Sequence, residues 1–315
     1  MSQGAVPPER IRRLNEGRER SGADFVLYWV QMCHRAEQNW ALTAAIEAAN
    51  RLGLPLVVYH GLGCTYPHAN DRISRFILEG VTELGERFAR RGILYHFYLR
   101  RRINDPNDVL YRLARRAALL VTDDFPSFIL PELTRRVTER IDVAMWAVDS
   151  NGIVPLAAIP GEQYGAHTLR PKIRKLLPEH LKPVPEPKVR RDSLGMSLKV
   201  PRTTVTAETI GSLIAESSID HSVPPSPLYR GGYLEARARL DRFITQALKR
   251  YSKARNEPAE ERTSRLRDIR ELPSAEQLRT RGSRVIRHRN RSSGIGCGPL
   301  ASDEARVVQE PDKKW

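Results

Sequence analysis

The sequence predicts an α/β protein whose main domain is doubly wound around a five-stranded parallel sheet. Three features of the 315-residue chain support this fold class. Five short apolar runs occur between residues 25 and 148. Their apolarity is continuous rather than alternating, which is typical of strands buried on both faces of a parallel sheet. Segments with helical periodicity separate the runs, so strand and helix alternate along the chain.

The first strand–helix–strand unit follows a polar and basic arm. Within residues 1–22 we expect a short helix or an arm around residues 11–15. The apolar run 25–30 is the first predicted strand. An alanine-rich helix follows over residues 39–52 and is closed by a glycine, which favours the left-handed conformation found at helix ends. The run 56–59 is the second strand, and the crossover between such parallel strands is right-handed.

The same alternation continues to residue 148. Asn70 or Asp71 caps the next helix, because their side-chain oxygens accept from the free N–H groups of a first turn. The remaining elements are helices over residues 73–91, 107–117 and 130–140 and strands over residues 93–99, 118–122 and 143–148. Ligands of such sheets bind beyond the carboxyl ends of the strands. In this chain those ends carry residues 31–34, 60–65, 99–105, 123–125 and 149–151.

Several residues near these ends have both a chemical and a structural interpretation. Tyr28-Trp29 lies in a buried strand, so core packing is favoured over contact with a ligand. Cys33-His34 supplies too few ligands for zinc, which takes four, or three plus water. Asp123-Asp124 is interpreted as a loop cap or a hydrogen-bonding pair at a cofactor edge rather than as an acid–base pair. The sequence contains no GxGxxG and no GxxxxGK[ST], which excludes a dinucleotide dehydrogenase and a P-loop NTPase.

The chain changes character after residue 177. Residues 178–230 are rich in proline and charge, and we expect an interdomain linker that lies across a surface without building a core. Residues 231–255 then have the apolar spacing of an amphipathic helix. After a polar turn, Thr263, Ser264 and Arg265 bring together hydroxyls, N–H groups and a guanidinium that can hold a phosphate. Without other support this triplet is an ordinary helix cap.

The overall charge points to a polyanionic partner. Lys and Arg number 52 against 37 Asp and Glu, a net charge of +15, which suits DNA, RNA or a membrane surface. The alternative is that a GC-rich genome enriches arginine. The basic residues 267–315 are expected to be a disordered tail that either contacts nucleic acid or is simply solvated. Three dispersed cysteines favour a reducing compartment. There is no apolar run long enough for a membrane span and no secretory signal.

Four ordered motifs resemble those of the class II cyclobutane-pyrimidine-dimer photolyases. They cover residues 24–266. They read LYWVQ with Arg35 and NWAL in the first unit, YPHANDR and FILEG over residues 66–80, VP and YGAHTLRPKI over residues 154–173, and LDRF, Tyr251, RNEP and TSRL over residues 240–266. Their order and spacing together are far more specific than any one of them.

The resemblance implies a domain plan and a reaction. The plan is an α/β antenna domain over residues 23–177, the linker over 178–230, and the start of an all-helical FAD domain over 231–266. The reaction is carbon–carbon cleavage of a pyrimidine dimer flipped out of DNA, driven by light and by an electron from reduced FAD. The cofactor contacts implied by position are Tyr251 beside the flavin and Thr263, Ser264, Arg265 and Leu266 at its phosphates and ribityl chain. An antenna chromophore of deazaflavin or folate type is also implied.

The chain departs from the family pattern after Leu266. The family continues from TSRL with SPYLHFG and further helices, whereas this chain reads RDIRELP and becomes the tail 267–315. We therefore expect a C-terminally truncated or frameshifted flavin domain, with the catalytic residues in the absent part, no metal site, and little or no repair by this chain alone. The expected partner is damaged DNA, met by a monomer in the cytoplasm of a bacterium or the nucleus of a eukaryote.

Two other functions stay open. The first is a nonenzymatic α/β module that holds a chromophore or a nucleotide and contacts nucleic acid through its basic tail. The second is a cryptochrome-like light sensor, although the ordered class II motifs favour repair over signalling.

Overall fold

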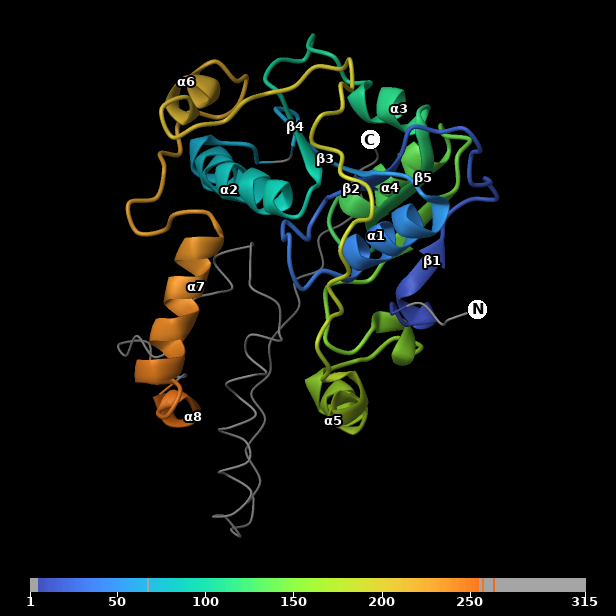
Figure 1. Ribbon diagram of the computed structural model, residues 1–315. Helices are drawn as coiled ribbons and strands as arrows, with labels where there is room; N and C mark the ends of the chain where they lie inside the picture. Colours follow the sequence, from blue (N-terminus) through green and yellow to red (C-terminus); the bar gives the residue numbers. More distant parts are fainter. Residues whose placement is uncertain (1–4, 67, 255–256, 258–262, 264–315) are drawn as a thin grey trace, which may run out of the picture.

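The computed structural model of the protein describes residues 5–66, 68–254, 257 and 263. Its main body is a six-stranded sheet with helices on both faces (Figure 1). The strands are β1 (Ile11–Arg13), β2 (Phe25–Trp29), β3 (Leu56–Gly63), β4 (Leu94–Arg100), β5 (Ala117–Asp123) and β6 (Met145–Val148). Their spatial order is β1-β6-β5-β2-β3-β4, and every pair is parallel except β1 with β6. The five predicted strands are confirmed.

The N-terminal segment forms a strand at residues 11–13, where the sequence predicted a short helix or an arm. A 3₁₀ turn, η1 (Pro8–Arg10), leads into β1, which pairs antiparallel with β6 and adds a sixth strand to the predicted five. Arg10 is buried and donates to the carbonyl oxygens of Asp149 and Ile153. These bonds draw the arm against the open edge of β6, whose unpaired backbone groups it satisfies.

The helices between the strands agree closely with the predicted alternation. They are α1 (Trp40–Leu52), α2 (Asp71–Arg90), α3 (Val109–Ala114) and α4 (Leu130–Thr138). Asn39 caps α1 by accepting from Leu42 N at 3.1 Å, and Asn70 caps α2 by accepting from Ile73 N at 3.0 Å. Helices α1 and α2 cover one face of the sheet, and α3 and α4 cover the other. Alternate residues of β2 enter the two cores, so this strand is buried on both faces.

The segment after β6 begins with two helices at the side of the sheet. These are the 3₁₀ turn η2 (Leu156–Ala158) and α5 (Ala166–His180). Helix α5 has no buried residue and projects from the lower end of the molecule in Figure 1.

The proline-rich segment 178–230 crosses the surface as predicted and covers the second edge of the sheet. His96 of β4 contacts the carbonyl oxygen of Pro201 through Nε2 at 2.8 Å, and Thr203 N donates to Phe97 O at 2.8 Å. The second contact, together with donation from Leu99 N to the Thr203 hydroxyl at 2.9 Å, satisfies backbone groups of the edge strand β4, so the segment covers part of this edge.

The same segment also contributes to the core, which corrects the expectation that it builds none. Val205, together with Ile210 and Ile214 of the short helix α6 (Ile210–Ala215), is buried in the apolar cluster formed with α1 and α2. Few apolar residues are present, but α6 places two of them one turn apart, on the side that faces α2.

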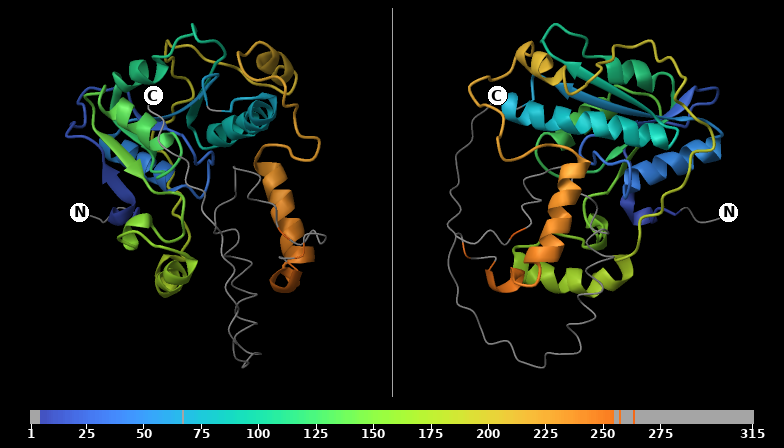
Figure 2. Two further views of the ribbon diagram at one scale, coloured as in Figure 1. Left: turned by 180° about the vertical axis from the view of Figure 1, so that it is seen from behind. Right: turned by 60° about the vertical axis from the view of Figure 1, so that its left-hand side comes forward.

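The predicted helix over residues 231–255 is divided into three pieces. They are α7 (Tyr233–Arg242), the π-helical stretch η3 (Phe243–Ala247) and α8 (Tyr251–Ala254). This helical arm leaves the α/β body and contacts α2 at its start (Figure 2). Among the described residues, no helix has the length and apolarity needed to cross a membrane.

Candidate functional site

The carboxyl edge of the sheet has its topological switch point between β2 and β5. The chain leaves β2 toward β3 on one side, whereas β5 lies on the other, and such a reversal opens the crevice where α/β proteins bind ligands. Here a side chain fills it. Asp123 accepts from the hydroxyl of Tyr28 at 2.7 Å and from the backbone N–H groups of Gln31, Met32 and Cys33 at 2.9, 2.7 and 2.9 Å. The interpretation of Asp123 as a loop cap is confirmed.

A second buried side chain completes this network. Asn39 donates through Nδ2 to the hydroxyl of Tyr28 at 3.0 Å and to the carbonyl oxygen of Cys33 at 3.1 Å. Ser150, which follows β6, donates to Oδ1 of Asn39 at 3.2 Å and accepts from Ala41 N at 2.8 Å. The loops that follow β2, β5 and β6 therefore meet in one buried hydrogen-bond network, which fixes the loop before α1.

The Tyr28 hydroxyl and the Cys33 thiol in and beside this network are uncharged. Burial, and after it the negative charge of Asp123, raises the pKa of Tyr28 well above its usual value. Burial likewise raises the pKa of the Cys33 thiol. A thiol held protonated is a poor metal ligand and a poor nucleophile. In the described part of the chain, no group of three or more His, Cys, Asp and Glu residues is placed to hold a metal ion.

Two histidines connect this network to β3. The rings of His34 and His60 are stacked with centroids 4.3 Å apart, and Nδ1 of His60 lies 2.6 Å from the hydroxyl of Tyr95. Burial, and to a smaller extent His34, lowers the pKa of His60 well below its usual value. His60 is therefore neutral at pH 7, and the ends of β2 and β3 are joined by packed rings rather than by charge.

The second structured region is the junction between α2 and the start of α7. Glu79 accepts from Gly231 N at 2.9 Å, and Glu83 accepts from Leu234 N at 3.0 Å. Two carboxylates one turn apart on α2 therefore meet the N-terminus of α7, where free N–H groups and the helix dipole favour negative charge. The sequence interpretation did not identify this junction.

Two successive glycines make this close approach possible. A Cβ atom on Gly231 would lie 1.8 Å from the carbonyl oxygen of Phe76, which no side chain tolerates. Gly232 has a φ of +110°, and a Cβ there would lie 2.8 Å from a carboxylate oxygen of Glu83. Adjacent glycines directly before an amphipathic helix were thus the signal for the junction.

Side-chain contacts seal the junction. The guanidinium of Arg87 lies over the ring of Tyr233, 3.6 Å from its centroid, and pairs with Glu37 at 2.7 Å. The cavity that remains between α2, α7 and His34 measures about 10 Å³, room for one water molecule at most. The first turn of α7 is therefore packed firmly on the α/β domain.

The predicted flavin contacts are only partly described. Tyr251 is 36% exposed and packs edge-on against Phe243, with ring centroids 5.6 Å apart. Thr263 is exposed. Ser264, Arg265 and Leu266 lie outside the described residues. Because three of the five predicted contacts are not described, we assign no step of electron transfer to these residues.

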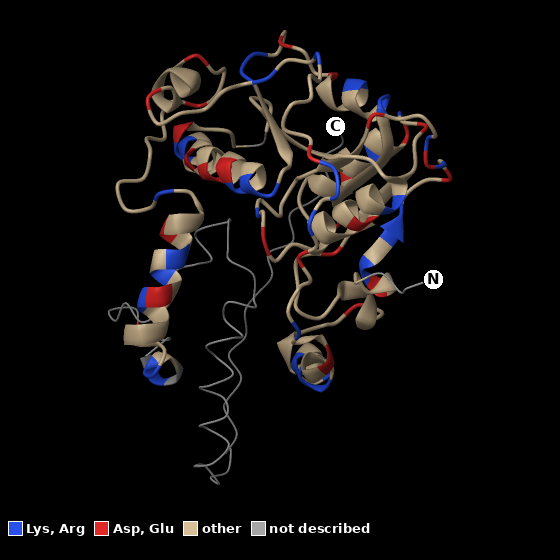
Figure 3. Ribbon diagram, viewed as in Figure 1, with Lys and Arg blue, Asp and Glu red and all other residues tan. Residues whose placement is uncertain are grey.

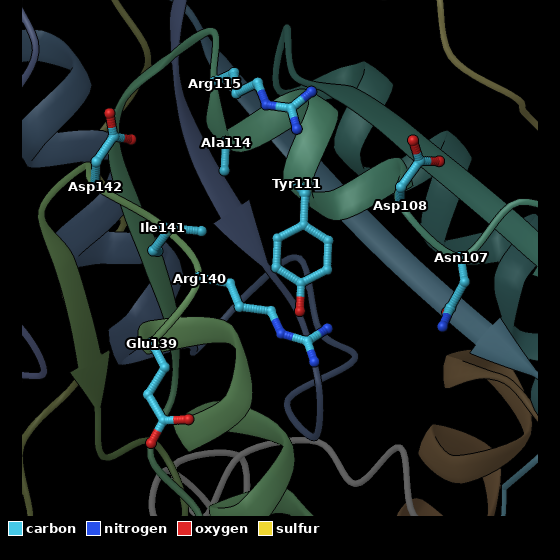
Figure 4. Close-up of a pocket in the computed structure, with 9 residues that line it drawn as sticks. All are labelled: Asn107, Asp108, Tyr111, Ala114, Arg115, Glu139, Arg140, Ile141 and Asp142. Carbon is cyan, nitrogen blue, oxygen red and sulfur yellow. The ribbon is translucent and has the colours of Figure 1, made fainter.

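A groove of about 850 Å³ lies on the other side of the sheet, between α3 and the end of α4 (Figure 4). Helix α3, which borders the groove, is six residues long. Tyr111 stands in its centre, with Arg140 directed toward its hydroxyl and Arg115 on the rim. The sequence interpretation did not identify this groove either.

Comparison with known proteins identifies the class to which this fold belongs. The sequence model described as DNA photolyase matches residues 26–188, more than half of the chain. The protein belongs to the DNA photolyase family.

The similar proteins agree with this assignment. The chain is 31% identical over 254 residues to a deoxyribodipyrimidine photo-lyase of Methanothermobacter thermautotrophicus, covering 80% of this chain and 54% of that protein. It is 28% identical over 265 residues to one of Arabidopsis thaliana, covering 81% and 52%. The chain thus spans about half the length of the curated relatives it matches.

Solved structures share the fold at low identity. A cryptochrome of Synechocystis superposes with a TM-score of 0.57 at 14% identity, covering 84% of this chain and 56% of that one. A class III photolyase of Agrobacterium tumefaciens gives 0.54 at 17% identity, covering 85% and 55%. The six-stranded α/β domain and the helices after it therefore share the fold of these structures.

Proposed function

We propose that this protein is a class II-type cyclobutane-pyrimidine-dimer photolyase, of which residues 23–266 carry the antenna domain, the linker and the beginning of the flavin domain. Family membership and the names of the relatives support the reaction class. The ordered motifs support the subclass. The observation that carries the proposal is the junction: Glu79, inside the FILEG motif, binds the backbone of Gly231 at the start of α7.

We also propose FAD as the cofactor, contacted by Tyr251 and residues 263–266. The chemistry expected of a bound, reduced FAD is donation of an electron to the dimer after light absorption. The role derived for the described residues is mechanical, since Glu79, Glu83 and Arg87 fix where the flavin domain begins on the α/β domain. The expected partner is damaged DNA, bound by a monomer in the compartment that holds the genome.

We propose that an antenna chromophore, of deazaflavin or folate type, binds at the carboxyl edge of the sheet. Asp123 fills the inner crevice, so a planar ligand lies outside it. There the rings of Tyr66 and Phe128 meet at 5.5 Å and join the loops after β3 and β5. Phe128 is 54% exposed and has a φ of 62°, a conformation that is uncommon for a bulky residue away from functional loops. Phe128→Ser should abolish retention of the chromophore without unfolding the protein.

A light-driven repair assay tests the proposal that this chain alone is inactive. Residues 1–315 are mixed with reduced FAD and with DNA that carries pyrimidine dimers, and are then exposed to near-UV light. We expect the dimers to persist, because the described residues do not surround a flavin. Efficient repair would overturn the claim of incompleteness and would support the enzymatic assignment directly.

The groove between α3 and α4 favours a second candidate function, that of a nonenzymatic module holding a chromophore or a nucleotide. Its volume of about 850 Å³ suits such a ligand, and Tyr111 with Arg140 offers a ring and a cation. Coloured protein after purification whose absorbance is lost in Tyr111→Ala and kept in Phe128→Ser would favour this module. The reverse pattern would favour the antenna site.

A further inference from the structure

Helix α5 carries cations that pair with no acidic side chain of the described residues. Its exposed side chains include four cations and one acid, Glu179. The cations are Arg170, Lys172, Arg174 and Lys175. Among the residues that the structure describes, none of these four forms an ion pair. This helix is therefore strongly basic at its surface.

The helical arm after the junction divides into a neutralised start and a cationic end. In α7, Arg237 pairs with Asp241 at 3.0 Å, and Arg239 pairs with Glu235 at 2.6 Å. Four more cations follow these pairs toward α8, all exposed and, within the described ranges, all without an ion pair. They are Arg242, Lys249, Arg250 and Lys253.

The two basic segments lie at the same end of the molecule. Helix α5 and helix α8 project from the lower end in all three views, away from the sheet (Figures 1 and 2). Figure 3 shows Lys and Arg on both of them. Eight exposed cations, none of them in an ion pair with the described residues, are therefore carried by two helical segments at this end of the molecule.

The apolar side of α5 does not compete with this surface. Leu169, Ile173, Leu176 and Leu177 recur along one side of the helix and are half-buried. The four cations occupy the remaining circumference at helical spacing. The helix carries no Trp, Phe or Tyr, and its aliphatic side chains are already partly covered, which is unlike a helix that inserts into a membrane surface.

We propose that α5 and the α7–α8 end form a surface, the α5/α8 surface, that binds the phosphate backbone of double-stranded DNA. Lys and Arg on a surface bind phosphates electrostatically and release the counterions of DNA, with no requirement for a particular base. A rigid polyanion can contact both supports at once. The α5/α8 surface binds intact and damaged DNA equally. The inference rests on the proposed function only for the choice of DNA as the polyanion.

The test measures the salt dependence of DNA binding by residues 1–315. A fluorescent 20-base-pair duplex, with or without a dimer, is titrated at KCl concentrations from 50 to 200 mM. The variant replaces Arg170, Lys172, Arg174 and Lys175 with Gln. Each lost phosphate contact lowers the slope of log K against log [KCl] by about 0.9, so four contacts lower it by about 3.6. The wild type then loses about 150-fold more affinity than the variant across this salt range.

A matched control removes four exposed, unpaired cations from other parts of the surface. It replaces Arg13, Arg102, Arg191 and Arg202 with Gln, which are exposed and form no ion pair with the described residues. We expect its slope to stay close to that of the wild type. A second variant with Arg170 and Arg174 changed to Lys keeps the charge and should keep the slope, and circular dichroism checks that each protein is folded.

Three outcomes would overturn the proposal. The first is an α5 variant whose slope equals that of the control variant. The second is a slope that changes only for dimer-containing DNA, which would assign these cations to lesion recognition. The third is an α5 variant that loses binding to phosphatidylserine vesicles and keeps its DNA slope, which would assign them to a membrane. Retention of the slope difference by a protein that holds neither FAD nor an antenna chromophore would count against the proposed function alone.

Discussion

Replacing Asp123 with asparagine removes the charge that organises the carboxyl edge of the sheet. Asp123 is buried, with one oxygen accepting from Tyr28 and the other from three backbone N–H groups. Asparagine keeps one accepting oxygen, so its NH₂ group must face either the hydroxyl of Tyr28 or the N–H groups. Because the Tyr28 hydroxyl already accepts from Asn39, it would be left without an acceptor for its own proton.

The expected cost follows from these contacts. Changing three hydrogen bonds from a charged to a neutral acceptor costs about 1 kcal/mol each, and an unsatisfied buried hydroxyl adds about 1–2 kcal/mol. A total near 4 kcal/mol corresponds to a fall in Tm of about 10 °C for a domain of this size. The neighbouring variant Asp124→Asn is the control, because its exposed ion pair with Arg12 is worth at most about 1 kcal/mol.

Thermal unfolding followed by circular dichroism measures both variants. We expect Asp123→Asn to unfold well below the wild type and Asp124→Asn to unfold within a few degrees of it. Equal Tm values for the two variants would refute the view that Asp123 organises this edge.

Three further predictions concern the junction and the histidines. Gly231→Ala should detach α7 from the α/β domain, because the new Cβ would meet the carbonyl oxygen of Phe76. We expect faster amide hydrogen exchange over residues 233–242 and unchanged exchange in the sheet. Tyr233→Leu keeps an apolar side chain and removes the ring under Arg87. Hydrogen exchange over residues 233–242 should then rise only slightly, corresponding to a loss of about 0.5–2 kcal/mol in the stability of the junction. Unchanged exchange would show that the cation–ring contact contributes nothing. Because the pKa of His60 is lowered in the folded protein, the unfolded chain binds a proton at a higher pH than the folded chain does, and stability falls as the pH drops below about 6.5. His60→Asn should therefore flatten the fall of Tm between pH 7 and 5. An unchanged dependence of Tm on pH would contradict a buried, neutral His60.

The parallel sheet was predictable because its strands are short continuous apolar runs separated by periodic helices. Strand β1 was not, since Ile11, Arg12 and Arg13 form no apolar run and become a strand only by pairing with β6. Tertiary pairing overrode the local pattern at this edge. The core role of Val205 and Ile210 was missed for a similar reason, because two isolated apolar residues in a proline-rich segment carry no periodicity.

The candidate sites were predictable to different degrees. The role of Asp123 as a loop cap followed from its position at the end of a strand, where turns need acceptors. The junction did not follow, because Glu79 and Gly231 are 152 positions apart and only the fold brings them together. The two glycines before α7 were visible in the sequence, but a glycine pair predicts close backbone approach without naming the partner.

A chimera tests the central claim most directly. Residues 1–266 of this chain are joined to the remainder of the Methanothermobacter photo-lyase beyond its matched region, and dimer cleavage is measured under near-UV light with FAD bound. We predict light-dependent repair by this chimera, and loss of repair when Gly231→Ala detaches α7. A chimera that folds and retains FAD but leaves the dimers intact would contradict the assignment of these residues to a working photolyase.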